Sequence, residues 1–308
     1  MTLNSVLITG GNGNLGHLLA DHFENIGIRV IVYDIVAPQR PMAASNIILG
    51  DIRDTEKLRS LFRNEHPDAV VHLAGLLSGS SEVDPIKAWE INATASVNLM
   101  QIAEQNHVGP FVFSSTVASY GSDVPERLSI DTPQWPQNVY GATKIATERM
   151  GYWMKTKSGF DFRCLRFPMV ISPFAPPGAV TAYPGHACFA AKSKKPFQFP
   201  VKAETGMSTL YLMDVVRSLA EFTLCDKAFV KRPAYNLHAF HFTAGMLAQS
   251  LQNRFPGATF TFEPKEPADS MIANWPDVVH DAHARDDWGW KHHYGFEETI
   301  EAILEMIN

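Results

Sequence analysis

Short apolar runs alternate with helical patterns through the first half of the chain. The runs cover residues 6–8, 29–34, 47–52, 69–75, 111–116 and 161–166. The longest helical segment between them covers 85–106, and its first residue, Pro85, suits a first helical turn. Repeated strand, helix, strand units imply a parallel sheet with right-handed crossovers. The pattern therefore predicts an α/β fold with a doubly wound parallel sheet over residues 1–170.

The pattern changes after residue 170. Residues 171–184 are rich in proline and glycine, which indicates a long loop that leaves the sheet. Beyond it we expect a short helix over 186–191, an apolar turn at Phe197, strands over 209–212 and 259–262, and helices over 214–224, 243–254 and 296–307. These elements predict a smaller, interwoven C-terminal substrate lobe over 171–308, from which 209–238 returns to the sheet.

Composition excludes several classes of protein. The 308 residues are 45% hydrophobic, as in an ordinary globular protein, and the formal charge of −6 argues against a nucleic-acid binder. No apolar stretch approaches the ~20 residues that span a bilayer. The N-terminus runs directly into the first apolar run, which leaves no room for a signal peptide. Three distant cysteines (Cys164, Cys188, Cys225) indicate reduced thiols, so we expect a cytoplasmic protein.

Three glycines follow the first apolar run. Gly10 lets the chain turn where a Cβ would clash, Gly13 lets the backbone approach a pyrophosphate, and Gly16 lets the next helix pack closely on the strand. The phosphates would lie at the positive N-terminus of the helix that begins near Leu15. The arrangement predicts a dinucleotide-binding Rossmann domain over residues 1–170.

Two acids follow the next strands. Asp34 ends the second run, where its carboxylate can accept hydrogen bonds from an adenosine ribose diol and would repel a 2′-phosphate. No basic residue adjoins it, so we expect NAD and not NADP. Asp51 lies near the end of the third run, and it either reaches an adenine amino group or caps the helix over 55–63. In the fourth run we expect His72 to be a buried core histidine.

The residues that carry chemistry come from the middle of the chain. Tyr140 and Lys144 lie four apart on a helix and share one face. Tyrosine titrates near ~10, and a nearby ammonium and an oxidised nicotinamide both favour its phenolate. Tyr140 could then remove the proton of a substrate hydroxyl. Lys144 would lower the pKa of Tyr140 and also bind the nicotinamide ribose. Thr116, at the end of the fifth run, would orient the same oxygen, with Ser115 as the fallback.

Two other features allow two interpretations each. The Ser/Gly-rich segment 76–83 is either a flexible surface loop or a substrate loop over the nicotinamide. Arg166, near a strand end, is either a structural anchor or a substrate clamp. Four histidines in the tail match no common zinc spacing, so we expect a solvated surface and no metal there (His280, His283, His292, His293). The Trp288-Gly-Trp290 pair indicates packing.

Five motifs in order resemble the extended short-chain dehydrogenase/reductase family over the whole chain. They are Thr-Gly-x-x-Gly-x-x-Gly at 9–16, His-Leu-Ala-Gly at 72–75, Ser-Ser-Thr at 114–116, Tyr-Gly-Ala-Thr-Lys at 140–144 and Arg-Phe-Pro at 166–168. The resemblance implies an NAD site formed by Gly10, Gly13, Asn14, Leu15, Gly16, Asp34, Asp51, Ile52, Leu73, Ala74, Gly75, Asn92, Ser114, Tyr140, Lys144 and Phe167. It also implies a homodimer whose interface is a four-helix bundle made by the helix that begins near Pro85 and the helix that carries Tyr140.

The tail is similar to the L-threonine 3-dehydrogenase branch of this family. Two segments of the tail carry the likeness, 271–276 and 281–290. Three earlier segments agree with it: 76–78 followed by Glu82 and Pro85, Pro177 and Gly178 with Thr181, and 207–214 with Tyr211. The resemblance implies NAD-dependent oxidation of a secondary hydroxyl on a small polar substrate, first of all L-threonine to 2-amino-3-oxobutanoate. The substrate contacts that it implies are Ser78, Thr116, Tyr140, Thr181 and Trp275.

The chain departs from that branch inside the expected substrate pocket. The branch has two adjacent threonines followed by Asp-Tyr, whereas residues 180–183 read Val-Thr-Ala-Tyr, and 208–210 read Ser-Thr-Leu in place of Pro-Met-Met. A lost hydrogen bond to a charged substrate group is worth ~1.5–3 kcal/mol. Three alternatives therefore stay open: a dehydrogenase of another β-hydroxy acid or amino acid, a sugar-nucleotide epimerase or dehydratase, and a redox-sensing binding protein without turnover.

Overall fold

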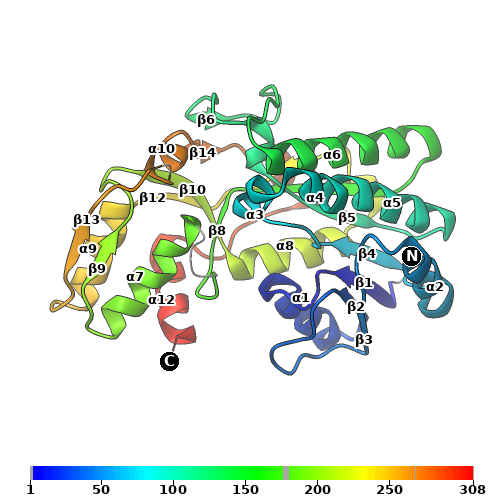
Figure 1. Cartoon of the computed structure of the whole chain (residues 1–308), viewed down its shortest axis with the longest axis horizontal. Coiled ribbons are helices and arrows are strands. Elements are labelled where there is room, and N and C mark those ends of the chain that lie inside the picture. The colour runs from blue at the N-terminus through cyan, green and yellow to red at the C-terminus, as the bar shows by residue number, and fades with distance from the viewer. Residues whose placement is uncertain (1–2, 176–179, 267, 308) are drawn as a thin grey trace.

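Seven parallel strands form the main sheet of the molecule (Figure 1). The computed structural model describes residues 3–175, 180–266 and 268–307. The sheet has the order β11-β7-β5-β4-β1-β2-β3, and every neighbouring pair is parallel. Its strands are β1 (Ser5–Thr9), β2 (Arg29–Asp34), β3 (Asn46–Leu49), β4 (Ala69–His72), β5 (Phe111–Thr116), β7 (Phe162–Phe167) and β11 (Tyr235–Asn236). The predicted α/β fold is confirmed.

Helices cover both faces of this sheet (Figure 1). One face packs against α1 (Asn14–Asn25) and α8 (Leu212–Leu224). The other packs against α2 (Thr55–Glu65), α5 (Ala95–Gln105) and α6 (Val139–Ser158). Because side chains alternate along a strand, Val6 and Ile8 of β1 join one core cluster and Leu7 joins the other. Strands buried on both faces read as continuous apolar runs, which is how the sequence shows them.

The order of strands reverses between β1 and β4. From β1 the chain proceeds outward through β2 and β3, and it then crosses back to β4 on the other side of β1. In open parallel sheets of this kind ligands bind at the carboxyl ends of the strands where the order reverses. Thr9 and His72, which end these two strands, are paired in register.

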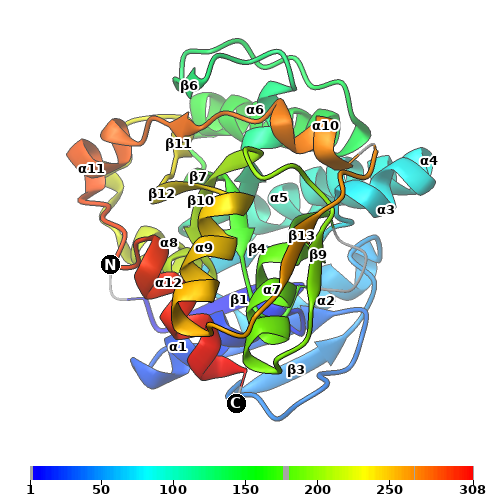
Figure 2. The ribbon, with the colours of Figure 1, turned by 90° about the vertical axis from the view of Figure 1, so that its left-hand side faces the viewer.

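A second body of structure lies beside the main sheet, and it faces the viewer in Figure 2. Its three-stranded sheet has the order β12-β10-β8, and β9 pairs with β13. Its elements are β8 (Met169–Ile171), α7 (Tyr183–Lys192), β9 (Phe197–Phe199), β10 (Gly206–Tyr211), β12 (Phe240–Thr243), α9 (Ala244–Arg254), β13 (Phe260–Phe262) and α12 (Phe296–Met306). They share one hydrophobic core cluster, which includes Met207, Leu247 and Ile300.

The expected return of 209–238 to the main sheet is only partly correct. Strand β11 does pair with β7, but β10 pairs with β8 and β12 in the second sheet. Pro168, which lacks an amide hydrogen, stands between β7 and β8. The ladder of the main sheet therefore ends at Phe167, and the chain beyond it pairs elsewhere.

Three further segments differ from the sequence prediction. The 76–83 stretch contains a short helix, α3 (Ser78–Val83), in which Ser81 Oγ donates to the Leu77 carbonyl at 2.9 Å. The helix over 85–106 is divided into α4 (Pro85–Trp89), a π-helical turn (Glu90–Thr94) and α5. Phe197 begins strand β9 and not a turn.

Short elements complete the chain. They are 3-10 turns at Val117–Tyr120, Val180–Ala182 and Lys227–Phe229, strands β6 (Arg127–Leu128) and β14 (Val278–Val279), and helices α10 (Ala268–Ala273) and α11 (Ala282–Trp288). Strand β14 pairs with β6 and so ties the C-terminal tail to the loop after β5. Within the part of the chain that the structure describes, no helix has the length and apolar character needed to cross a membrane.

Candidate active site

The glycine turn after β1 leaves space for a ligand. Gly10 has a φ of +71°, and a Cβ there would lie 2.7 Å from the Ala74 nitrogen. A Cβ on Gly16 would lie 2.5 Å from the Gly11 Cα, so only glycine allows α1 to pack this closely. A Cβ on Gly13 would meet only the Gly10 carbonyl oxygen, at 3.3 Å. Gly13 also caps α1 without a side-chain hydrogen bond, which leaves first-turn amides open to a phosphate.

Asp34 ends β2 beside this turn. Its Oδ2 accepts from the Asn12 amide at 2.9 Å, and its Oδ1 accepts from the Val36 amide at 3.1 Å. The buried Asn12 Oδ1 has no hydrogen-bond partner among the described residues. Ile35 and Val36, which follow Asp34, are 66% and 54% exposed and uncharged. The carboxylate therefore keeps lone pairs for a ribose diol, and no cation directly follows it.

Asp51 does not cap a helix. The cap of α2 is Asp54, whose carboxylate accepts from the Lys57 amide at 3.0 Å. The cap interpretation of Asp51 is therefore wrong, because Asp54 lies closer to the first turn. The Asp51 carboxylate instead pairs with Arg53 at 2.6 Å, and this hydrogen bond lowers the pKa of Asp51. The next residue, Ile52, is buried in the sheet's core.

His72 joins β1 and β4 at the point where the strand order reverses. Its Nδ1 lies 2.6 Å from Thr9 Oγ1, and its Nε2 lies 2.8 Å from Ser96 Oγ on α5. Burial lowers the pKa of His72 to about 3, so the ring is neutral. The prediction of a buried, hydrogen-bonded core histidine is confirmed. The ring holds together the two strand ends that lead to Gly10 and Ala74.

The loop after β4 is held by Asn92 of the π-helical turn. Asn92 Oδ1 accepts from the Leu76 amide at 2.7 Å, and its Nδ2 donates to the Leu76 carbonyl at 3.0 Å. A Cβ on Gly75 would lie 3.0 Å from Asn92 Oδ1. Asn92 was expected to touch the cofactor, but the structure places its amide against the loop backbone. Leu73 and Ala74 precede this loop and are partly buried.

Lys144 and Tyr140 lie on the first turns of α6. Lys144 Nζ donates to the Ser114 carbonyl at 2.8 Å and stands 5.5 Å from the centre of the Tyr140 ring. Burial lowers the pKa of Lys144 to about 8 and raises the pKa of Tyr140 to about 12. The lowered tyrosine pKa expected beside Lys144 is therefore absent from the protein by itself. Within the described residues the Tyr140 hydroxyl has no hydrogen-bond partner.

Thr116 is brought to the start of α6 by close backbone packing. Its Oγ1 accepts from the Ala118 amide at 3.1 Å, which caps the 3-10 turn after β5. A Cβ on Gly141 would lie 2.5 Å from the Ala118 carbonyl oxygen, so the glycine beside Tyr140 allows this approach. The fallback residue Ser115 points to the other side of β5, where its hydroxyl donates to Glu148. Of the two hydroxyls, Thr116 is the one free to face a ligand.

The remaining predicted residues lie in several elements. Ser78 begins α3, which packs on α6. Thr181 lies in the 3-10 turn before α7, and the predicted contact segment at Pro177 and Gly178 lies outside the described residues. Trp275 is partly buried against the second core, and the next residue, Pro276, accepts from the Ser208 amide. The other positions are Asn14 and Leu15 in the first turn of α1, Ser114 on β5 and the buried Phe167 on β7.

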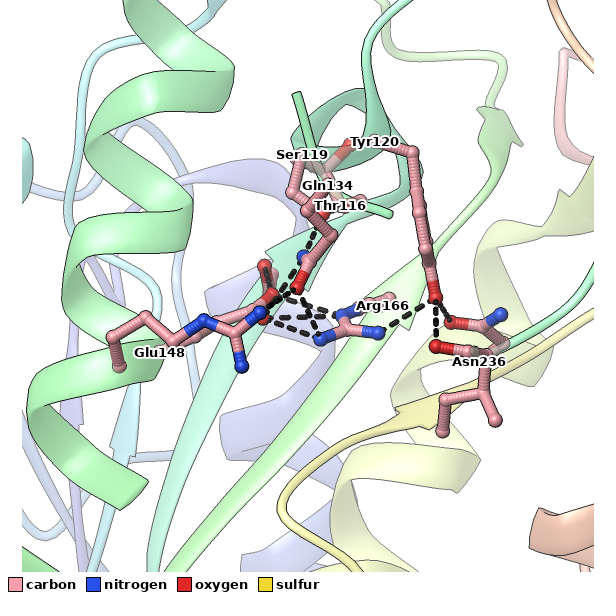
Figure 3. Close-up of polar contacts among 10 residues, drawn as sticks. Thr116, Ser119, Tyr120, Gln134, Glu148, Arg166 and Asn236 are labelled. Atoms are coloured by element: carbon pink, nitrogen blue, oxygen red, sulfur yellow. Dashed lines mark hydrogen bonds and ion pairs between the residues drawn. The ribbon is translucent and has the colours of Figure 1, made fainter. Parts of the chain in front are cut away.

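A buried polar network next to Thr116 was not predicted (Figure 3). Arg166 Nη2 lies 2.6 Å from Glu148 Oε2, and both side chains are about 5% exposed. Arg166 Nη1 donates to the Tyr120 hydroxyl at 2.6 Å, so Arg166 is a structural anchor. One feature of the sequence could have indicated Glu148: it lies four residues after Lys144 and so on the same helix face.

The tail residues have structural partners. Trp290 is fully buried, and its Nε1 donates to Asp281 at 3.1 Å, which confirms the packing role. The ring centroids of Trp288 and Phe222 lie 4.9 Å apart, with the two planes tilted by 40°. Across the ranges given for this structure, no group of three or more His, Cys, Asp or Glu could hold a metal ion.

Comparisons with known proteins agree with this geometry. A model of the NAD dependent epimerase/dehydratase family matches residues 6–236. The chain belongs to this family. Its cofactor is therefore NAD, which fits the open glycine turn, the uncapped helix and the Asp34 carboxylate.

Relatives within the family include dehydrogenases. The mitochondrial L-threonine 3-dehydrogenase of Bos taurus is 31% identical over 306 residues, 98% of this chain and 82% of the relative. The structure of L-threonine dehydrogenase from Clostridium difficile has a TM-score of 0.94 at 25% identity and covers 100% of this chain and 98% of that one. The holo form of a GalE-like L-threonine dehydrogenase from Cupriavidus necator has a TM-score of 0.93 at 28% identity, over 99% of this chain and 100% of that one. This family member is accordingly an NAD-dependent oxidoreductase.

Proposed function

We propose that the protein oxidises a secondary hydroxyl group on a small polar substrate, with L-threonine as the first candidate and 2-amino-3-oxobutanoate as its product. The observation that carries the proposal is that α6 and β5 bring Thr116, Tyr140 and Lys144 to one end of the sheet. The resemblance to the bovine L-threonine 3-dehydrogenase over nearly the whole chain supports the choice of substrate.

The residues proposed to hold NAD surround the end of β1. Gly10, Gly13, Gly16, Asn14 and Leu15 would face the pyrophosphate, Asp34 the adenosine ribose, and Asp51 and Ile52 the adenine. On the nicotinamide side the proposed residues are Leu73, Ala74, Gly75, Asn92, Ser114, Tyr140, Lys144 and Phe167. When bound, NAD supplies the hydride acceptor and, in its oxidised form, a positive charge.

Tyr140 is the proposed base. Burial keeps its phenol protonated in the protein by itself, and a positive charge near the ring favours the phenolate. Lys144, which Ser114 holds in place, contributes such a charge. Tyr140 Oη would take the proton of the substrate hydroxyl group. The hydrogen on the carbon that bears this hydroxyl would leave as hydride, for which NAD is the acceptor. The Thr116 hydroxyl would donate to the substrate oxygen and fix its direction.

We propose that residues 1–170 bind the cofactor and that 171–308 bind most of the substrate. Ser78, Thr181 and Trp275 would contact the substrate together with Thr116 and Tyr140. The role of Trp275 is supported by the anchoring of its segment: the Ser208 amide of β10 donates to the Pro276 carbonyl, and β14, which follows, pairs with β6. Ser208, which bonds the residue after Trp275, begins the run 208–210 that departs from the threonine dehydrogenase pattern. The choice between L-threonine and other hydroxy compounds is therefore the first thing to measure.

The subunits are proposed to form a homodimer through a four-helix bundle. Helix α4 packs on α6, and both helices carry exposed apolar side chains. Ile86 and Trp89 of α4 are 73% and 47% exposed, and Trp153 of α6 is 54% exposed. Exposed groups of large apolar residues mark interaction sites.

A cytoplasmic location stays a prediction. It is supported by the described cysteines, which are free thiols, as is usual for proteins of a reducing compartment.

The first test is NADH formation, followed by absorbance, with NAD and L-threonine. L-allo-threonine, L-serine, D-3-hydroxybutyrate and a UDP-sugar are run beside it. A selective rate with L-threonine that disappears in Tyr140→Phe supports both the reaction and the substrate. A rate with another hydroxy compound alone overturns the substrate. Tight retention of NAD with protection by the UDP-sugar, and no net NADH, indicates an epimerase or dehydratase.

A further inference from the structure

Glu148 is a buried carboxylate on the helix that carries the proposed base. It is 4% exposed, and Arg166 reaches it from β7 with Nε 3.1 Å from each carboxylate oxygen and Nη2 2.6 Å from Oε2. Figure 3 shows this pair at the centre of a network that runs to Tyr120 and Asn236. Fork-like contacts of this kind fix direction as well as charge. The carboxylate is therefore held in one orientation.

The network ties Ser115 and the Thr116 carbonyl to α6. On one side the Ser115 hydroxyl donates to Glu148 Oε1. On the other side Gln134 Nε2 donates to Glu148 Oε2 at 3.2 Å and to Ser119 Oγ at 2.8 Å. Ser119 Oγ in turn donates to the Thr116 carbonyl at 2.8 Å. One carboxylate of α6 is thus linked both to the residue before Thr116 and, through Gln134 and Ser119, to the Thr116 carbonyl.

Glu148 also acts on Lys144 through its charge. The two residues lie four apart, so they share one face of α6 with Tyr140. Burial disfavours the Lys144 ammonium and lowers its pKa to about 8, against opposing effects of Cys164 and Glu148. Burial raises the pKa of Cys164 far above its ordinary value, so this thiol is neutral near neutral pH. His72, on β4, is neutral as well. Among the groups that act on Lys144 in the described residues, Glu148 is the remaining charge that favours the ammonium.

We propose that Glu148, anchored by Arg166, is a positioning residue that keeps Lys144 charged and fixes the end of β5 that carries Thr116. The inference rests on the proposed function, in which Thr116, Tyr140 and Lys144 react as one set. Glu148 touches neither substrate nor cofactor in this scheme, and it acts through Lys144 and Ser115.

Glu148→Gln tests the charge. Competitive acetylation of the unliganded protein with acetic anhydride, read on the Lys144 peptide by mass spectrometry, measures where Lys144 titrates. We expect its midpoint to move to lower pH by about half a unit or more, because a favourable charge is lost. The alkaline limb of kcat/KM should move the same way. Asp123→Asn is the matched control: it removes one exposed carboxylate far along the chain from Glu148 and should leave the midpoint unchanged.

Ser115→Ala tests the position of β5. It removes the hydroxyl that donates to Glu148 and leaves both charges in place, so kcat should fall several-fold while the KM for NAD and the Lys144 midpoint stay unchanged. This variant also decides the proposal if Glu148→Gln does not fold. An unmoved Lys144 midpoint in folded Glu148→Gln, or an unchanged kcat in Ser115→Ala, overturns it. Acetylation needs no substrate, so inactivity of the wild-type protein toward threonine would refute the proposed function without touching this test.

Discussion

Acid should weaken the fold through His72. The ring is buried and neutral in the folded protein, where it bridges Thr9 and Ser96. Burial lowers the pKa of His72 from its ordinary 6.5 to about 3. Below pH 6.5 the unfolded chain therefore binds a proton that the folded chain excludes. The free energy of unfolding is lost progressively as the pH falls from 6.5 toward about 3.

The size of this effect follows from the two pKa values. A pH of about 5 is roughly one and a half units below the pKa of the unfolded histidine, and each unit lowers the free energy of unfolding by about 1.4 kcal/mol. His72 alone should therefore cost about 2 kcal/mol between about pH 8 and pH 5. His72→Gln keeps a donor and an acceptor for Thr9 and Ser96 but cannot take up a proton. The variant should be less stable at pH 8 and should lack this part of the pH dependence.

Urea unfolding of both proteins at the two pH values measures the double difference. Other titrating groups cancel in this comparison, because they are present in both proteins. Exposed His280→Gln serves as the control and should follow the wild type. Should His72→Gln lose as much stability between pH 8 and pH 5 as the wild type does, the reasoning about His72 is wrong.

Three further predictions concern the site and the subunit contact. Gly10→Ala should abolish NAD binding, measured by fluorescence titration, and lower the melting temperature, because its Cβ would lie 2.7 Å from the Ala74 nitrogen. Gly13→Ala should weaken NAD binding but leave the melting temperature nearly unchanged, because its Cβ would meet only the Gly10 carbonyl oxygen, at 3.3 Å. Asp34→Asn should raise the ratio of NADP to NAD turnover at least several-fold, since it removes the charge that repels a 2′-phosphate; an unchanged ratio would contradict the role of Asp34. Trp153→Glu should yield monomers in light scattering, and a persisting dimer would place the interface elsewhere.

The cofactor half of the site could be predicted because its signals are local. Gly10, Gly13 and Gly16 act within one turn, and their need for space is a property of the backbone that any fold of this kind imposes. Tyr140 and Lys144 lie on one helix face whatever packs against it. The alternation of apolar runs with helical patterns likewise predicted the parallel sheet, because strands buried on both faces must be apolar throughout.

Tertiary structure decided what depends on partners far apart in the chain. Which of Ser115 and Thr116 faces the ligand depends on the side of β5 that packs on α6, and a run of three hydroxyl residues does not show it. Glu148 and Arg166 are eighteen residues apart, and only the packing of α6 against β7 joins them. The pairing of β10 with β8 in a second sheet depends on where the chain travels after Pro168. Spacing in the sequence limits short-range geometry, whereas contacts between elements arise from the packing of the whole chain.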